Sequence, residues 1–429
     1  MSKTRGIDQE KLKVRFLKPE AKISRRELLK LVIPRYEVIP FVESASCRGS
    51  RECGLCLDTC PLAAIKSEND EVTIDTALCR GCGACIEACP YRAITYPTFS
   101  LEQLDKEMAK LFAAEGTPVK PGIMAFVCQN CRPVADGDSV TPPAYPAGIL
   151  PLIVPCLAMV SPWLMLRAFD RGASGLALIF SQRKCPVGLA MDRWQGKVRF
   201  VQALLKVWAI EPESIRVFNI DDDSANLARQ LGQFAAEIAG SVPLPWRLSE
   251  PVPVPNDAWR LPVLVRGLRN KLGVPAGVVT DGVVPFGKLE LDESRCIGCG
   301  LCVRDCPSEA LAASSNEETG DYKLLFRHDL CLACAKCITV CPEKCLKLER
   351  ILELDKMDRP AVVLFEDSMA RCRECGSFIG PRALVDGLQL KLGAMGDSLT
   401  SMLELCPACK MKVQFGPGRD AREPVNQPD

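Results

Sequence analysis

The feature that most constrains this sequence is a repeated cysteine motif, C-x-x-C-x-x-C-x-x-x-C followed by proline. It occurs four times, in two pairs, and the first copy is stretched by extra residues after its first cysteine. The copies are, in chain order, Cys47, Cys53, Cys56 and Cys60; Cys79, Cys82, Cys85 and Cys89; Cys296, Cys299, Cys302 and Cys306; and Cys331, Cys334, Cys337 and Cys341. So regular a spacing of thiols predicts metal centres with sulfur ligands.

Three cysteines spaced in this way can hold three corners of a [4Fe–4S] cluster, while a more distant cysteine supplies the fourth. Tetrahedral zinc prefers two separated C-x-x-C pairs and would leave the middle cysteine of each triplet unused. The two pairs of motifs resemble bacterial-type dicluster ferredoxins, over residues 40–100 and 288–350. In that family the cysteine before proline binds the other cluster of its pair.

The resemblance therefore implies four [4Fe–4S] clusters, two in each ferredoxin-like module. The implied ligands are Cys47, Cys53, Cys56 and Cys89 for cluster I; Cys60, Cys79, Cys82 and Cys85 for cluster II; Cys296, Cys299, Cys302 and Cys341 for cluster III; and Cys306, Cys331, Cys334 and Cys337 for cluster IV. Cys345 takes the place of an alanine in the other three motifs, so we expect it to be structural rather than a ligand.

The composition supports sulfur ligation in a reducing compartment. The chain has 25 cysteines and one histidine among 429 residues. An odd cysteine count in a chain of this size argues against a disulfide scaffold, and we expect a cytoplasmic location. The single His328 excludes a C-x-x-C-H haem motif, a C₂H₂ zinc finger and a Rieske centre. Because 54 basic and 53 acidic residues balance, net charge predicts no nucleic-acid partner.

Two segments resemble targeting or membrane elements, and we expect both to be ordinary structure. Residues 24–30 resemble a twin-arginine export motif, but no apolar stretch follows. Ser24 and Glu27 instead form a capping box, which predicts a short helix in a basic N-terminal arm, residues 1–39. Residues 139–166 are uncharged and apolar, but repeated prolines favour a buried strand and a helix over a membrane span.

Hydrophobic periodicity divides the rest of the chain. Residues 101–240 alternate apolar runs, at 123–127, 152–154, 176–180 and 217–220, with helical stretches near 162–171, 192–209 and 224–239. This alternation predicts an α/β domain, an open parallel sheet with helices on both faces. Residues 241–287 are expected to be a Pro-rich, semi-rigid linker, and residues 351–429 a C-terminal tail. The expected fold class is thus α+β and multidomain.

The central α/β domain has four cysteines of its own. Cys128 and Cys131 follow its first expected strand, Cys156 the second and Cys185 the third, so all four should meet at the carboxyl edge of one sheet. Four thiolates on loops suit a [2Fe–2S] cluster or zinc. Residues 126–131, 154–156 and 185 resemble the delta subunit of methyl-viologen-reducing hydrogenase. That resemblance implies a [2Fe–2S] cluster and electron delivery to heterodisulfide-reductase-type flavoproteins.

The C-terminal tail contains two further C-x-x-C pairs separated by a helix-like stretch. They consist of Cys372 with Cys375 and Cys406 with Cys409. This spacing is typical of a structural Cys₄ zinc site, as in zinc ribbons, and another iron–sulfur cluster is the alternative. Either group would stabilise a small tail with few core residues.

The sequence shows no G-x-G-x-x-G opening a helix, no Walker A loop and no nucleophile elbow, so we expect no independent catalytic site. We predict an electron-transfer subunit of an oxidoreductase complex. The resemblances imply a flavoprotein or heterodisulfide-reductase-like partner, with a hydrogenase or formate dehydrogenase as donor. A redox-sensing or scaffolding protein and an enzyme acting on a small oxidant are the alternatives. The donor, the acceptor, the direction of flow and the potentials are left open by the sequence.

Overall fold

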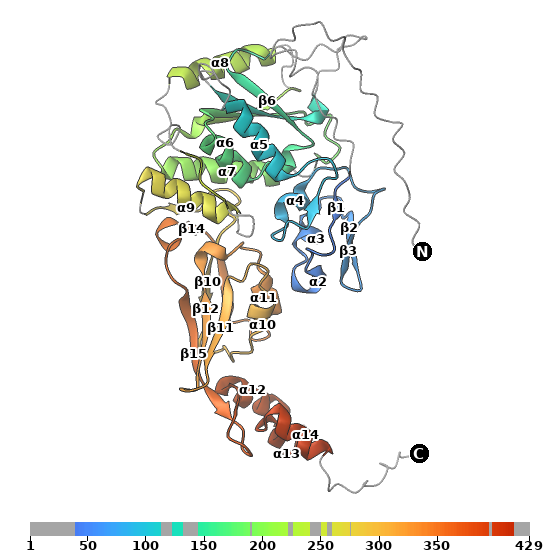
Figure 1. Ribbon diagram of the computed structural model, residues 1–429, viewed down its shortest axis with the longest axis vertical. Helices are drawn as coiled ribbons and strands as arrows, with labels where there is room; N and C mark the ends of the chain where they lie inside the picture. Colours follow the sequence, from blue (N-terminus) through green and yellow to red (C-terminus); the bar gives the residue numbers. More distant parts are fainter. Residues whose placement is uncertain are drawn as a thin grey trace.

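The computed structural model describes residues 39–112, 122–131, 145–188, 191–221, 226–240, 250–254, 260–274, 276–393 and 397–415. Along the long axis of the molecule lie the α/β domain, the two ferredoxin-like modules and, at the far end, the C-terminal helices (Figure 1). The basic N-terminal arm and its expected helix lie outside the described residues.

The first module is built from short strands and single-turn helices around its cysteine loops. Its elements are β1 (Phe41–Val42), α2 (Gly49–Glu52), α3 (Leu55–Thr59), β2 (Ile65–Glu68), β3 (Glu71–Ile74), α4 (Ala84–Ala88) and β4 (Ile94–Thr95). Strands β2 and β3 form a hairpin between the two motifs. Asn69 and Asp70 have φ angles of 50° and 73°, the left-handed conformation that a two-residue hairpin turn needs. Strands β1 and β4 pair and close the module.

The prediction of an open parallel sheet in the central domain is confirmed. Its elements are α5 (Leu101–Phe112), β5 (Ile123–Cys128), β6 (Ile149–Val154), the 3₁₀ turn η3 (Leu157–Met159), α6 (Pro162–Asp170), β7 (Gly175–Phe180), α7 (Met191–Val207), β8 (Ile215–Asn219) and α8 (Leu227–Gly240). The sheet order is β6-β5-β7-β8, with every neighbouring pair parallel. All residues of β5 and β7 are buried, as a parallel sheet covered by helices requires.

The apolar stretch before residue 166 forms a strand and a helix, as predicted. Strand β6 lies at the edge of the parallel sheet, and α6 begins at Pro162 after Ser161, whose hydroxyl accepts a hydrogen bond from the Leu164 amide. Within the described part of the chain, no helix combines the length and the apolar character that a bilayer crossing requires.

The expectation of a semi-rigid linker over residues 241–287 is wrong for its second half, which is folded. Helix α9 (Arg260–Leu272) packs against α6, with Leu264, Val265 and Leu268 fully buried. Its Arg266 guanidinium donates to Asp329 and to the Met357 carbonyl at 2.6 and 2.8 Å. Proline content suggested an extended spacer, but the apolar face of α9 forms a connection between the α/β domain and the second module.

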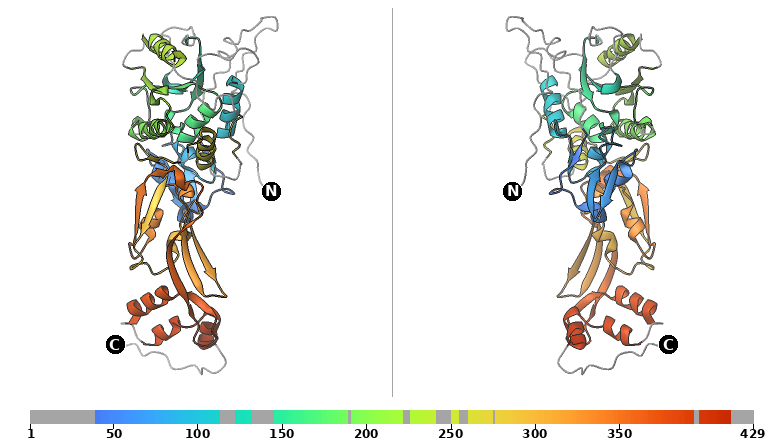
Figure 2. Two further views of the ribbon diagram at one scale, coloured as in Figure 1. Left: turned by 90° about the vertical axis from the view of Figure 1, so that its left-hand side faces the viewer. Right: turned by 90° about the vertical axis from the view of Figure 1, so that its right-hand side faces the viewer.

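The second module and the tail share one sheet. Its elements are β9 (Val278–Val279), β10 (Gly287–Leu291), α10 (Leu301–Arg304), β11 (Leu311–Asn316), β12 (Asp321–Phe326), α11 (Lys336–Val340), β13 (Leu346–Arg350), β14 (Leu352–Glu353), β15 (Val362–Arg371), β16 (Phe378–Pro381), α12 (Arg382–Leu392), α13 (Asp397–Leu403) and α14 (Pro407–Phe415). The hairpin β11–β12 continues through β15 to β16. These strands run toward the C-terminal helices (Figure 2), so residue 350 does not separate two independent units.

A buried ionic network joins the helices of the α/β domain. The Arg167 guanidinium, 5% exposed, donates to Asp105 of α5 at 2.9 Å and to Asp170 at 2.6 Å. Lys271 of α9 lies 3.0 Å from the other oxygen of Asp170. Burial alone would raise the pKa of Asp105, but hydrogen bonds from Arg171 and Arg167 hold the pKa below its ordinary value. The network therefore fixes α5 and α9 to α6.

The change Asp170→Ala should lower the stability of the chain by about 3–5 kcal/mol, because it leaves the buried Arg167 without its closest partner. Chemical denaturation followed by circular dichroism measures the effect. The control is Glu237→Ala, which removes an exposed ion pair with Arg216 and should change the unfolding midpoint little. Equal effects of the two changes would contradict the role of the network.

Candidate metal centres

Each of the four cysteine loops uses a left-handed residue to start a one-turn helix. Gly54, Gly83, Gly300 and Ala335 have φ angles of 65°, 73°, 72° and 64°, and each precedes the third cysteine of its motif by two residues. The helices α3, α4, α10 and α11 then carry that third cysteine inward. Its thiol is buried in every motif. The loop conformation therefore turns the cysteines of one motif toward a common point.

In the first module, the thiols gather in the two sets that the ferredoxin resemblance implies. Burial, together with the charges of Cys89, Cys53 and Cys47, raises the pKa of Cys56 to about 12. Burial likewise raises the pKa of Cys85, whose neighbours include Cys82, Cys79 and Cys60. The cysteine before proline thus lies with the triplet of the other motif. The charge of Cys56, from the other set, also raises the pKa of Cys85, so the two sets are adjacent.

The second module repeats this arrangement. Burial raises the pKa of Cys302 to about 12, with the charges of Cys299, Cys296 and Cys341 adding to it. Burial also raises the pKa of Cys337 to about 12, and its neighbours are Cys331, Cys334, Cys306 and, from the other set, Cys302. In both modules the crossed pairing of motifs brings together the residues predicted for one cluster.

Cavities lie among two of these sets. One is lined by Cys60, Cys79, Cys82 and Cys85 together with Ile65 and Ile74. Another is lined by Cys306, Cys331, Cys334 and Cys337 together with Leu289 and Phe326. Four convergent thiols in an apolar wall fit an iron–sulfur cluster, whose ligands are thiolates and whose surroundings exclude water.

Backbone amides point at several of the sulfurs. The amides of Gly81 and Gly298 donate to Cys79 Sγ and Cys296 Sγ at 3.4 and 3.5 Å. After the prolines, the amides of Ala64 and Ala93 donate to Cys60 Sγ and Cys89 Sγ at 3.2 and 3.3 Å. Such hydrogen bonds favour the thiolate over the thiol and help to set the reduction potential of a bound cluster.

The cysteines of the central domain meet at the carboxyl edge of its sheet. Cys156 lies within hydrogen-bonding reach of both Cys128 and Cys185, and the contact with Cys128 is the main cause that raises the pKa of Cys156, to about 12. The Ala158 amide donates to Cys156 Sγ at 3.5 Å. The side chain of Cys131 lies outside the described residues, and its backbone is in the turn after β5. Three of the four predicted ligands are therefore brought together by the ends of β5, β6 and β7.

No pattern in the sequence indicated that this edge of the sheet would face the first module. Cys156 and Ala158 pack with Cys82 and Ala84 in one buried apolar group. A salt bridge of 2.6 Å between Lys197 of α7 and Glu87 of α4 closes the same interface. The central site and the predicted cluster II are therefore neighbours. Both sides of the contact are made of small residues, which carry no periodic signal in the sequence.

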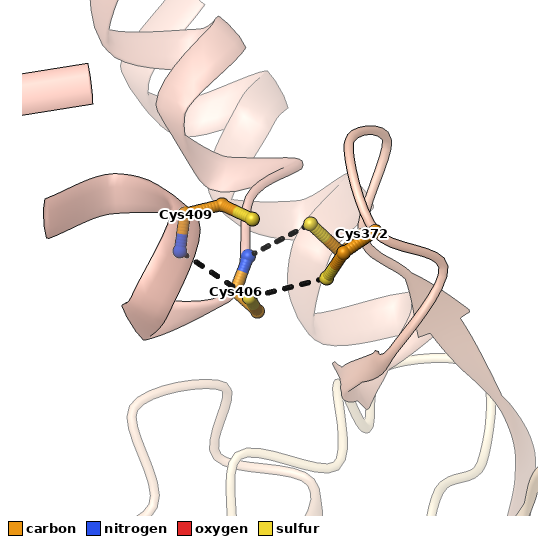
Figure 3. A group of neighbouring side chains, drawn as sticks. Cys372, Cys406 and Cys409 are labelled. Atoms are coloured by element: carbon orange, nitrogen blue, oxygen red, sulfur yellow. Dashed lines mark hydrogen bonds between the residues drawn. The ribbon is translucent and has the colours of Figure 1, made fainter. Parts of the chain in front are cut away.

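The tail holds the tightest group of thiols. The Sγ atoms of Cys372, Cys375, Cys406 and Cys409 all lie within 4.8 Å of one another, and Cys375 Sγ is 3.6 Å from Cys406 Sγ. Figure 3 shows three of them turned toward one another. A tetrahedral ion with metal–sulfur bonds of about 2.3 Å needs sulfurs about 3.8 Å apart. The spacing fits one ion bound by all four thiols.

Two further features of these sulfur groups bear on their roles. The Cys406 amide donates to Cys372 Sγ at 3.3 Å, which lowers the pKa of Cys372 and favours the thiolate that a metal needs. Cys345 is buried, with its Sγ 3.5 Å from Cys341 Sγ. It thus packs beside the predicted cluster III, in the place that alanine takes in the other motifs.

Comparison with known protein families agrees with this geometry. The family model described as the delta subunit of methyl-viologen-reducing hydrogenase matches residues 123–240. A 4Fe-4S dicluster domain matches residues 290–348, and a 4Fe-4S binding domain matches residues 72–95. Formate hydrogenlyase subunit 6 of Escherichia coli (strain K12) is 38% identical over 135 residues, which are 29% of this chain and 72% of the relative.

The chain belongs to the family of formate hydrogenlyase subunit 6. This family member is an iron–sulfur protein, because its dicluster domain and its 4Fe-4S binding domain contain three of the four cysteine loops described above. The suspected architecture, a hydrogenase delta-subunit domain combined with ferredoxin-type domains, is confirmed. The compared part is 29% of this chain, so most of the chain lies outside it.

The contact between the central domain and the first module can be tested at Gly83. A Cβ there would lie 2.7 Å from Tyr96 Oη and 3.0 Å from Met159 Cβ, whereas a Cβ at the equivalent Gly300 would meet nothing within 4 Å. Both Gly83→Ala and Gly300→Ala add left-handed strain of about 1–2 kcal/mol. Only Gly83→Ala should add a further penalty of about 1–3 kcal/mol from overpacking. Thermal unfolding and retained iron measure the difference, and equal losses would contradict the contact.

Proposed function

We propose that this chain is an electron-transfer subunit of a hydrogenase-related oxidoreductase complex, which relays single electrons through four [4Fe–4S] clusters and a [2Fe–2S] centre. The observation that carries the proposal is the gathering of the sixteen motif cysteines in four sets of four, in two adjacent pairs. The bound clusters would supply reversible one-electron oxidation and reduction.

The residues of the chain would bind, shield and tune these groups. The thiols of each set would act as ligands, and the apolar walls that include Ile65, Ile74 and Phe326 would exclude water. Amides such as those of Gly81 and Ala64 would stabilise the negative charge on sulfur through hydrogen bonds. No acid or base is required, because single-electron transfer breaks no bond.

For the central site we favour [2Fe–2S] over zinc, with Cys128, Cys131, Cys156 and Cys185 as ligands. The support is the match of this domain to the delta subunit of methyl-viologen-reducing hydrogenase and the convergence of Cys128, Cys156 and Cys185 on one sheet edge. The site would exchange electrons with a flavoprotein or heterodisulfide-reductase-like subunit. The likeness to formate hydrogenlyase subunit 6 supports a hydrogenase or formate dehydrogenase at the other end.

For the tail we propose a structural zinc ion bound by Cys372, Cys375, Cys406 and Cys409. The support is the mutual spacing of the four sulfurs, which suits one tetrahedral ion. Val385 of α12 and Leu405, between α13 and α14, are among the few buried apolar residues in the described part of the tail, so a metal would supply much of the stability there.

Anaerobically purified protein should contain about 16 irons in four cubanes and about two more in the central site, with matching acid-labile sulfide. Cys82→Ala should lose iron and sulfide from cluster II, because it removes a ligand. Cys345→Ala is the matched control and should keep the full iron content, since alanine occupies the equivalent positions 64, 93 and 310. Iron and sulfide assays with EPR during stepwise reduction make the test. Wild-type protein with zinc but no sulfide would overturn the proposed function.

The tail site makes a separate prediction. Cys406→Ser should lower bound zinc from about one ion per chain to almost none and leave the iron unchanged, because its thiol belongs to no ferredoxin-type set. Elemental analysis of the desalted protein measures both metals, with wild type as reference. Loss of iron in this variant, or zinc that stays at the wild-type level, would contradict the assignment.

A further inference from the structure

The two ferredoxin-like modules contact each other beside their cysteine loops. The Tyr91 hydroxyl donates to the Pro307 carbonyl at 2.5 Å, across 216 residues of chain. Tyr91 follows Cys89 by two residues, and Pro307 directly follows Cys306. Cys89 belongs to the set predicted for cluster I and Cys306 to that for cluster IV. The hydrogen bond therefore connects, through short covalent segments, a predicted ligand of one module to a predicted ligand of the other.

A lysine approaches the same interface from the second module. Lys336 is the first residue of α11 and lies between Cys334 and Cys337 in sequence. Its ammonium lies 3.5 Å from the Ser50 carbonyl of the first module. The ammonium also lies close to Gly54, the residue after Cys53: a Cβ added to Gly54 would be 3.5 Å from Lys336 Nζ. The Lys336 charge therefore lies between the two predicted clusters and interacts with both modules.

The environment of Tyr91 holds the bridge in place. The Arg48 guanidinium lies 5.4 Å from the centroid of the Tyr91 ring, in cation–π geometry. The phenol is half-buried and donates its hydrogen bond to the Pro307 carbonyl. Figure 1 shows α2 and α3 of the first module beside α10 and α11 of the second.

We propose that electrons pass between the two modules at this contact, with Tyr91 as the bridging residue and Lys336 as a positioning residue. The inference rests on the proposed function. It orders the centres as central site, cluster II, cluster I, cluster IV and cluster III, because the central site packs on Cys82 and the crossed sets adjoin within each module. The order of the motifs along the chain would instead place cluster III after cluster II.

The step across the interface is a one-electron exchange. One module is oxidised by a single electron and the other is reduced by the same electron, while no bond forms or breaks and no proton moves. Tyr91 is not itself oxidised, since it serves as a hydrogen-bonded path between Cys89 and Cys306. In the test, dithionite or a photoreductant supplies the electron.

The matched variants are Tyr91→Phe, which keeps the ring and removes the hydroxyl, and Thr339→Val, which removes an exposed hydroxyl of α11 bonded to the Lys336 carbonyl of its own helix. Flash photoreduction should show electron exchange between the modules slowed several-fold in Tyr91→Phe and unchanged in Thr339→Val. Lys336→Met should shift the potentials of clusters I and IV downward and leave that of cluster II unchanged, because a cation stabilises the reduced cluster.

Spin–spin coupling in pulsed EPR should be observed between clusters I and IV in the reduced wild type. Exchange at the wild-type rate in fully iron-loaded Tyr91→Phe would overturn the bridging role. Absence of the coupling from iron-loaded wild type would overturn the proposed order. Absence of iron and sulfide from the wild type would instead refute the proposed function.

The contact itself can be measured in the iron-loaded protein without following electron transfer. Hydrogen exchange at residues 48–54 and 305–309 should be faster in the double variant Tyr91→Phe/Lys336→Met than in Thr339→Val, because the double variant loses both bonds between the modules. Unchanged exchange would overturn the docking on which the path depends.

Discussion

Burial of thiols in groups of four is the constraint on which the two modules depend. Desolvation and mutual repulsion both raise the pKa of cysteines such as Cys56 and Cys337, so a cluster of thiolates there is unfavourable without a cation to balance it. Backbone amides that point at sulfur offset part of this cost. Because so few other residues fill the modules, metal binding and folding should be one coupled process.

The central domain, the two modules and the tail are joined by contacts that involve few residues. Small residues around Cys156 and Cys82 let the central sheet edge approach the first module. Tyr91 and Lys336 bring the two modules together, and Gly298 lies close enough to Pro381 for a Cβ to be 3.0 Å from it, next to the start of the tail helices. Close approach at each of these places shortens the distance between neighbouring centres, which is what a relay needs.

Much of this fold could be predicted from the sequence because its signals are local. The four cysteine motifs, the hairpins and the alternation of strands and helices over residues 123–240 depend on near neighbours along the chain. The placement of α9 could not be predicted, since the prolines before it suggested an extended spacer, and its partners Asp329 and Met357 lie far away in sequence. The Tyr91–Pro307 contact could not be predicted either, because it joins residues far apart in the sequence and a single tyrosine produces no periodic pattern.

The strand β15 has a consequence for the biosynthesis of the protein. It pairs with β12 of the second module but lies some forty residues after it in the chain. During translation, β12 therefore emerges before the strand that covers one of its edges has been made. Until β15 pairs with it, the backbone donors and acceptors of that edge are open to pairing with other chains. Truncation at residue 350 would make that temporary state permanent. The C-terminal segment thus acts as a protective cover for the module that precedes it.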